Sequence, residues 1–256
     1  MIFETLHDKI AHAASLFKQS HYALAFTGAG ISTDSGIPDF RSQELGLWHN
    51  VDAMTVASIF GFKRNPQAFY DWVAPLTRTT LAARPNNAHI TLAELERRGF
   101  LHGVITQNID MLHTRAGSQC IYELHGHMRT ATCISCFKVF EGEPILKQFI
   151  EDGRVPHCKI CNGVLKPDVI LFGEQLPIRE FQNAQEAVRR CDLMLVVGSS
   201  LEVAPAGDIP LMAARRGTKL IIINLEPTPA DKMAEVVIHA RAAEILPEIA
   251  RRVESL

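Results

Sequence analysis

Four of the six cysteines form two pairs with C-x-x-C spacing, Cys133 with Cys136 and Cys158 with Cys161, and 21 residues separate the pairs. This spacing predicts a tetrahedral Zn²⁺ site, because each pair offers two thiolates to one edge of the metal. Four thiolates leave no open coordination position, so the predicted zinc is structural rather than catalytic. A redox-active dithiol and an iron centre are the alternatives.

A glycine-rich turn formed by Gly28, Ala29 and Gly30 directly follows an apolar run. Glycine lets the backbone approach a phosphate closely, and a helix that starts after the turn offers unpaired N–H groups. The hydroxyl of Ser32 adds a further donor. The turn therefore predicts a nucleotide phosphate site, although Thr33 stands where the dinucleotide fingerprint has its third glycine. A plain strand-to-helix turn is the alternative.

Clusters of polar residues follow three further apolar runs. They are Gln107, Asn108, Ile109 and Asp110 after residues 103–106, Gly198, Ser199 and Ser200 after residues 193–197, and Asn224, Leu225 and Glu226 after residues 220–223. The carboxyl ends of parallel strands meet at one edge of a sheet, where ligands of open α/β folds bind. Together with the glycine-rich turn, the clusters predict one shared nucleotide crevice. For Asn108 and Asp110, capping of the next helix is the alternative.

His125 is the candidate general base among the 11 histidines. An imidazole changes its charge near neutral pH, so it suits proton transfer in that range. Its surroundings single it out, because Gly126 leaves room for another group to approach and the cysteine-rich segment begins just after it.

Short apolar runs rich in Val, Ile and Leu predict strands that are buried on both faces. They lie at residues 23–27, 103–106, 193–197, 220–224 and 236–239. Helical patterns lie between and around them, at residues 3–19, 87–98, 179–190, 204–216 and 243–252. The alternation predicts an α/β fold, a parallel sheet with helices on both faces. Residues 42–86 and 127–168 interrupt it, and we interpret them as insertions.

The 256 residues have globular proportions, 47% hydrophobic and 21% charged. The formal net charge of -2 gives no general attraction to nucleic acid or to an anionic membrane. No stretch approaches the roughly 20 apolar residues of a membrane span, and the N-terminus lacks the apolar core of a signal peptide. We therefore expect a cytoplasmic protein with reduced cysteines and without nucleic-acid or membrane partners.

Taken together and in this order, the motifs resemble the sirtuin family of NAD-dependent protein-lysine deacylases, in its short bacterial type. Gly36-Ile37-Pro38-Asp39-Phe40-Arg41 and Phe172-Gly173-Glu174 add to the resemblance, which spans about residues 20–245. The resemblance implies one catalytic domain over residues 1–256. Its parts are then a Rossmann-like NAD-binding core at residues 20–42, 87–126 and 169–246, a helical insertion at residues 43–86 and a zinc-binding insertion at residues 127–168.

The resemblance also implies which residues contact NAD. Those implied to hold the pyrophosphate and the adenosine are Gly28, Ala29, Gly30, Ser199, Asn224 and Glu226. Further implied contacts are Ser32, Ile37, Ile109, Gly198, Ser200, Leu225 and Ala242. Phe40 is implied to shield the reactive sugar from water, and Arg41 to touch NAD near the phosphates. Asn108 and Asp110 are implied to position the nicotinamide-ribose end as catalytic residues, with Gln107 on the ribose.

An acylated-lysine peptide is the second substrate that the resemblance implies. Its groove and acyl tunnel are implied to be lined by Val169, Phe172, Gly173, Glu174 and Leu176. The acyl oxygen then attacks the ribose carbon as nicotinamide leaves, and His125 acts as general base for a ribose hydroxyl. The products are free lysine, nicotinamide and O-acyl-ADP-ribose. Protein mono-ADP-ribosylation and a non-catalytic module that binds NAD or acyl-lysine are the alternatives.

The expected acyl preference follows from one position at which this sequence departs from a pattern within the family. Sirtuins that prefer acidic acyl groups such as succinyl carry a Tyr and, three residues later, an Arg in the helical module. Here Val73 follows Tyr70 at that spacing, so the cation is missing. We expect acetyl groups to be removed faster than succinyl groups, because an apolar tunnel disfavours a charge. Initial rates on matched peptides test this expectation, and faster desuccinylation contradicts it.

Overall fold

The computed structural model describes residues 5–39 and 53–255, and its larger part is built on a parallel sheet. The strand order is β3-β2-β1-β7-β8-β9, and each neighbouring pair runs parallel. The strands are β1 (Ala23–Thr27), β2 (Val104–Thr106), β3 (Ile121–Glu123), β7 (Leu193–Val197), β8 (Lys219–Ile223) and β9 (Val236–Ile238). The order reverses between β1 and β7, which places a ligand crevice outside the carboxyl ends of these strands.

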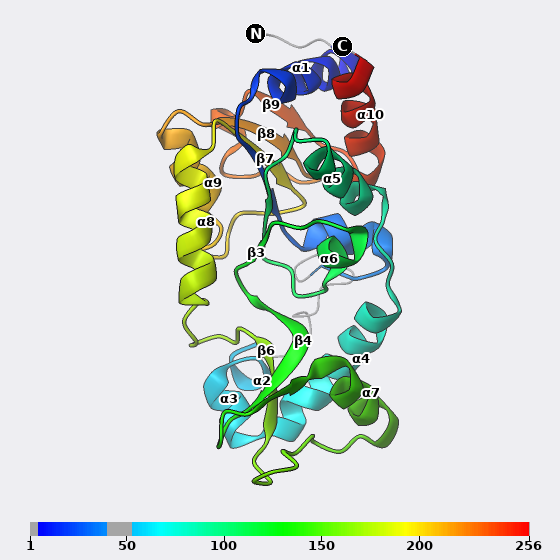
Figure 1. The fold of residues 1–256 in the computed structure, drawn as a ribbon, viewed down its shortest axis with the longest axis vertical. Helices are drawn as coiled ribbons and strands as arrows, with labels where there is room; N and C mark the ends of the chain where they lie inside the picture. Colours follow the sequence, from blue (N-terminus) through cyan, green and yellow to red (C-terminus); the bar gives the residue numbers. More distant parts are fainter. Residues whose placement is uncertain (1–4, 40–52, 256) are drawn as a thin grey trace.

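Helices cover both faces of this sheet (Figure 1). They are α1 (Leu6–Gln19), α5 (Asn87–Arg97) and α10 (Ala242–Ser255) on one face, and α8 (Ile178–Arg190) and α9 (Asp208–Arg215) on the other. Side chains along a strand alternate between the faces. Leu193 and Leu195 of β7 accordingly pack with α1, α5 and α10, whereas Met194 and Val196 pack with α8 and α9. Burial on both faces explains the unbroken apolar runs.

A smaller part lies at the other end of the molecule (Figure 1). It contains an antiparallel sheet in the order β5-β4-β6 and several helices. The elements are α2 (Ala53–Val56), α3 (Ile59–Arg64), α4 (Pro66–Ala82), β4 (Gly126–Cys133), β5 (Val139–Glu141), α7 (Gly142–Asp152) and β6 (Leu165–Val169). Its core is aromatic: the Tyr70 and Phe149 ring centroids lie 4.9 Å apart, and the Phe69 and Tyr70 rings meet edge to face.

Three short helical segments complete the described chain. They are η1 (Ala29–Ser35), α6 (Leu112–Ala116) and η2 (Asp231–Met233). Asn86 ties η1 to α5, because its Oδ1 accepts the N–H of Ala88 at 2.9 Å and its Nδ2 donates to the Ile31 carbonyl at 2.8 Å. Within the described residues, none of the helices has both the length and the apolar composition that a membrane crossing requires.

The predicted α/β fold class is confirmed, and all of the predicted strands are present within one or two residues of their expected bounds. The expected helix at residues 204–216 begins later, at Asp208. Pro205 explains the difference, because a residue that precedes proline is disfavoured in helical conformation. The short strand β3 was not predicted, since three residues carry too little pattern to be recognised.

The turns that follow β1 and β7 are in backbone contact at the crevice. The N–H of Gly30 donates to the carbonyl of Gly198 at 2.9 Å. A Cβ on Gly30 would lie 2.9 Å from the Gly198 Cα, and a Cβ on Gly198 would lie 2.2 Å from the Ile31 nitrogen. Gly198 also has a φ of +58°, a region that disfavours other residues. Glycine is therefore required on both turns.

We expect Gly198→Ala to lower the free energy of unfolding by about 1–3 kcal/mol more than Gly99→Ala does, because the added methyl displaces backbone. Gly99 is the matched control, since it also has a positive φ, +80°, but nothing lies within 4 Å of its added Cβ. Urea unfolding of the two variants measures the difference. Equal stability of the two variants would show that the contact between the turns is not tight.

Candidate active site

A cavity of about 1760 Å³ lies where the larger and smaller parts meet, outside the carboxyl ends of the strands. Almost every residue that the sequence assigned to NAD, peptide or catalysis lines it. The lining residues of that set are Gly28, Ala29, Gly30, Gln107, Asn108, Ile109, His125, Val169, Phe172, Gly173, Glu174, Leu176, Gly198, Ser199, Ser200, Asn224, Leu225, Glu226 and Ala242. Ser32, Ile37 and Asp110 are buried outside this lining. Phe40 and Arg41 lie outside the described residues.

The glycine-rich turn leads into η1, with Gly28 as its N-cap. Thr33, the departure from the dinucleotide fingerprint, has a place in this turn. Its hydroxyl donates to the carbonyl of Gly30 at 3.0 Å. The side chain therefore satisfies a backbone acceptor that a third glycine would leave to another partner. Because Gly28, Ala29 and Gly30 carry at most a methyl group, this part of the turn presents backbone rather than bulky side chains to the cavity.

A buried polar network lies beneath the turn. The hydroxyl of Ser32 donates to a carboxylate oxygen of Asp110 at 2.6 Å. The side-chain amide of Asn108 donates to the carbonyl of Gly28 at 3.0 Å and approaches the Ser32 oxygen at 3.3 Å. Burial raises the pKa of Asp110, against the opposing effect of its hydrogen bonds from Ser32 and from the Leu112 backbone. The network fixes Asn108 and Asp110 to the floor of the phosphate turn.

Two histidines below this network were not singled out from the sequence. His113 bonds through Nε2 to the hydroxyl of Thr27 at 2.9 Å, and that hydroxyl donates to Thr106 at 2.9 Å. Thr106 in turn accepts the backbone N–H of Asn108 at 3.0 Å. His89 lies beside His113, with ring centroids 4.9 Å apart. Burial lowers the pKa of both rings, that of His89 to about 4, so both are neutral at pH 7.

His125 lies at the junction of the two parts. Its Nδ1 is 3.0 Å from the carbonyl of Gln107, and a carbonyl only accepts hydrogen bonds, so Nδ1 carries the proton. Nε2 of the neutral ring therefore keeps its lone pair. Burial lowers the pKa of His125, and the bond to Gln107 opposes that shift. The Gln107 side chain donates to the Ser199 hydroxyl at 2.9 Å, which joins three strand ends around the cavity.

The far end of the cavity, beyond β8 and β9, is shaped by backbone contacts. The Asn224 side chain donates to the carbonyl of Glu226 at 2.7 Å, and the Asn224 carbonyl accepts from His239 at 3.0 Å. An ion pair of 2.6 Å joins Arg241 to Asp34 across the cavity mouth. Neither member of this pair was predicted, since single charged residues have no distinctive sequence pattern.

The opposite end is bounded by residues 169–176, which we call the peptide edge. Its backbone joins the connection between α2 and α3, since Phe172 donates to the Ala57 carbonyl and accepts from the Ile59 N–H, both at 2.9 Å. Gly173 has a φ of +84°, and its virtual Cβ lies 3.3 Å from the Phe60 ring. Phe172 is 44% exposed, so it offers an apolar surface at the rim.

Only one of the two positions behind the acyl expectation, Val73, lines the cavity. Tyr70 does not line the cavity; it is fully buried and donates its hydroxyl to the Leu165 carbonyl at 2.7 Å. Val73, the position where the cation is missing, lines the cavity together with Leu76, three residues further along α4. They continue into an apolar wall, whose other members include Phe69, Trp72, Met128 and Leu171. Since both Val73 and Leu76 are uncharged, this wall also lacks a cation.

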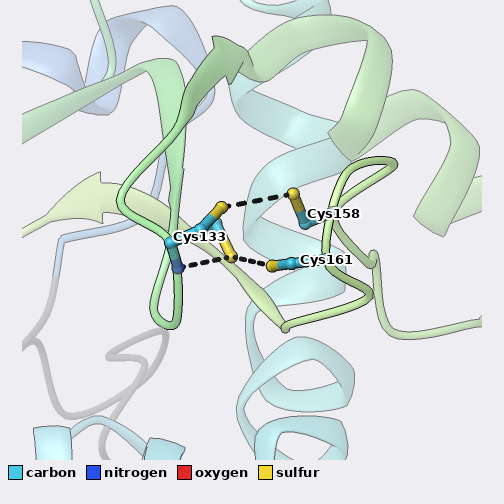
Figure 2. Close-up of side chains that lie close together, drawn as sticks. Cys133, Cys158 and Cys161 are labelled. Carbon is cyan, nitrogen blue, oxygen red and sulfur yellow. Dashed lines mark hydrogen bonds between the residues drawn. The ribbon is translucent and has the colours of Figure 1, made fainter.

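The four paired cysteines come together in the smaller part, and their sulfur atoms lie within 4.8 Å of one another. Figure 2 shows the Cys133, Cys158 and Cys161 side chains pointing toward one centre. Sulfurs bound at about 2.3 Å to one tetrahedral Zn²⁺ lie about 3.8 Å apart. The Cys133–Cys161 and Cys136–Cys158 sulfur separations of 3.5 and 3.7 Å fit this geometry. Backbone N–H groups of Cys136 and Ser135 lower the pKa of Cys133 to about 6, which favours a thiolate.

Comparison with known proteins shows close relatives over almost the full chain. Residues 28–205 match the sequence profile of the Sir2 family. The NAD-dependent protein deacylase 2 of Archaeoglobus fulgidus is 46% identical over 252 residues, which are 98% of this chain and 98% of the relative. An NAD-dependent protein deacetylase of Thermodesulfovibrio yellowstonii is 44% identical over 95% of this chain and 94% of its own.

Solved structures agree with the sequence matches. A structure described under "Structural Basis for the Mechanism and Regulation of Sir2 Enzymes" has a TM-score of 0.91 and 46% identity, and covers 98% of this chain and 99% of that chain. A Sir2 complex with a deacetylated p53 peptide and 3'-O-acetyl ADP ribose has a TM-score of 0.88 and 39% identity, over 96% and 97%. From the profile, the coverage and the shared fold, this chain belongs to the Sir2 family.

Proposed function

We propose that this protein removes acetyl and other uncharged acyl groups from protein lysine side chains, with NAD as co-substrate. The products are free lysine, nicotinamide and O-acyl-ADP-ribose, and one water is consumed. The observation that carries the proposal is the place of His125 in one cavity between the glycine-rich turn and the peptide edge. The relatives named deacylase and deacetylase, and the acetyl-ADP-ribose complex of a Sir2 enzyme, support it.

Each wall of the cavity has a task in this reaction. The turns at Gly28–Gly30 and Gly198–Ser200 hold the pyrophosphate of NAD, residues 224–226 lie at the adenosine, and Asn108 with Asp110 fix the nicotinamide-ribose end. NAD, when bound, supplies an electrophilic ribose carbon and nicotinamide as leaving group. His125 accepts a proton at Nε2 from a ribose hydroxyl, because the Gln107 carbonyl keeps its proton on Nδ1.

The acyl-lysine enters from the peptide edge and places its acyl group against the wall formed by Val73 and Leu76. An apolar wall accepts an uncharged acyl group, whereas a carboxylate would be buried without a partner there.

The core that binds NAD comprises residues 20–42, 87–126 and 169–246, and the insertions at 43–86 and 127–168 supply the acyl wall and the zinc site. Four thiolates kept reduced for zinc suit a cytoplasmic protein.

The first test measures nicotinamide release from NAD, with and without an acetyl-lysine peptide, together with deacetylation of the peptide. We expect peptide-dependent release that falls by about 100-fold or more in His125→Ala, because a general base contributes that much. The pH profile is a second readout. Only the neutral imidazole accepts a proton, and burial lowers the His125 pKa, so the acidic fall in rate lies below pH 6.5.

His21→Ala is the matched control, because His21 is exposed at the opposite end of β1 from the cavity. This variant retains the wild-type rate if the loss is specific to His125. Peptide-independent release, with radiolabel from NAD on protein, would contradict the deacylase and indicate ADP-ribosylation. No release from folded wild-type protein, with any of a panel of uncharged acyl peptides, would indicate a binding module.

A structural role for the zinc gives a separate prediction. We expect one zinc per chain by elemental analysis, and we expect Cys133→Ala to lose the metal and unfold at lower temperature, since thiolate–zinc bonds hold β4 to the loop at Cys158. Cys120→Ala is the control that keeps the metal, because Cys120 lies outside the cluster. A purified, fully folded protein without metal would contradict the structural zinc.

A further inference from the structure

A buried lysine that the reaction does not use lies directly below the peptide edge. Lys166 belongs to β6, and only 9% of its surface is exposed. Its Nζ donates to the carbonyl of Val169 at 2.8 Å and to the carbonyl of Pro167 at 3.2 Å. A carboxylate oxygen of Glu174 lies 3.0 Å from the same nitrogen. All three ammonium protons thus have acceptors, and two of the acceptors belong to the peptide edge.

Glu174 contacts both Lys166 and the backbone of the peptide edge. The carboxylate oxygen that faces Lys166 also accepts the backbone N–H of Leu171 at 2.8 Å. The Glu174 N–H in turn donates to the Leu171 carbonyl at 3.0 Å. Lys166 and Glu174 therefore link the beginning of the peptide edge, at Val169, to its middle and to the residue just beyond Gly173.

Other backbone hydrogen bonds of the peptide edge are made with residues outside the ion pair. Ile170 donates to the carbonyl of His125 at 2.8 Å, and Phe172 is held between Ala57 and Ile59. These bonds fix residues 170 and 172. The carbonyl of Val169 and the N–H of Leu171 depend on the ion pair instead. Without it, two polar backbone groups of the buried residues Val169 and Leu171 lose their partners, which is costly.

An ion pair that is largely removed from water is weak evidence that it stabilises the fold. Removing a lysine and a glutamate from water costs free energy that their attraction only partly returns, and apolar side chains often fill such a site equally well. Lys147 and Glu143 of α7 form the exposed counterpart, 2.6 Å apart with both side chains 57% exposed. The Lys166–Glu174 pair, with side chains 11% and 23% exposed, differs in that its members reach the backbone that lines the cavity.

We propose that Lys166 is a positioning residue for the acyl-lysine peptide, which acts through Glu174 and the Val169 carbonyl to hold the peptide edge in its binding shape. The inference rests on the proposed function. It also changes the role of Glu174 from a substrate contact to half of a clamp within the protein. The Lys166 ammonium contacts Pro167, Val169 and Glu174, and none of these belongs to the turns that hold NAD, so the clamp affects peptide binding and leaves NAD binding alone.

The test compares Michaelis constants for an acetyl-lysine peptide at saturating NAD and for NAD at saturating peptide. In Lys166→Met we expect the KM of the peptide to rise by about tenfold, because hydrogen bonds to a charged group are lost. In Glu174→Gln we expect a smaller rise of about threefold, because the amide keeps the shape and loses the charge. In both variants the KM of NAD stays within about twofold. Lys166→Arg keeps the charge and restores part of the loss.

Lys147→Met is the matched control, because it breaks the exposed Lys147–Glu143 pair, which also lies in the smaller part. We expect it to leave the KM of the peptide and the KM of NAD unchanged. The thermal unfolding of every variant is measured to show that it folds. If Lys166→Met does not fold, the peptide KM of Glu174→Gln tests the clamp. Folded variants with an unchanged peptide KM, or with equal rises for peptide and NAD, overturn the clamp. Absence of peptide-dependent nicotinamide release in the wild type would instead overturn the proposed function itself.

Discussion

The backbone contact between the turns after β1 and β7 is the constraint on which the rest of the site depends. Gly30 and Gly198 approach so closely that neither accommodates a Cβ without a backbone shift. The contact lies where the strand order of the sheet reverses, so the crevice that topology leaves open is lined there by peptide groups. Peptide N–H groups suit a pyrophosphate, and they need neither a lysine nor an arginine from the turn itself.

The polar groups behind these turns are buried, and burial shifts the pKa values of three of them. Burial raises the pKa of Asp110 and lowers that of His89 and His113, so each group is shifted toward its neutral form. The network holds its geometry through hydrogen bonds between buried groups. Asn108 is held in this way, from the Gly28 carbonyl on one side and from Thr106 on the other.

Much of the fold and the chemistry was predictable, because each depends on local pattern. Apolar runs such as residues 193–197 identify strands of a parallel sheet, and the cysteine spacing identifies the metal site. Apart from Val73, the acyl wall was not predictable in this way. Helix α4 is buried on several sides, at Tyr70 and Thr77 as well as at Val73, so hydrophobic periodicity does not indicate which face meets the cavity. Lys166 was missed because a lone charge in a strand carries no signal of burial.

Strand β4 explains how a metal remote from the chemistry serves the active site. The strand begins at Gly126, directly after His125, and ends at Cys133, so one element carries the proposed base at one end and a zinc ligand at the other. At about 3.3 Å per residue, a strand of this length spans at most about 23 Å. β4 also pairs with β6, which carries Lys166 and leads into the peptide edge. A zinc held by the four cysteines would therefore stabilise the sheet that holds His125 and the substrate-binding backbone in register, although a closed coordination shell would leave it no part in the reaction.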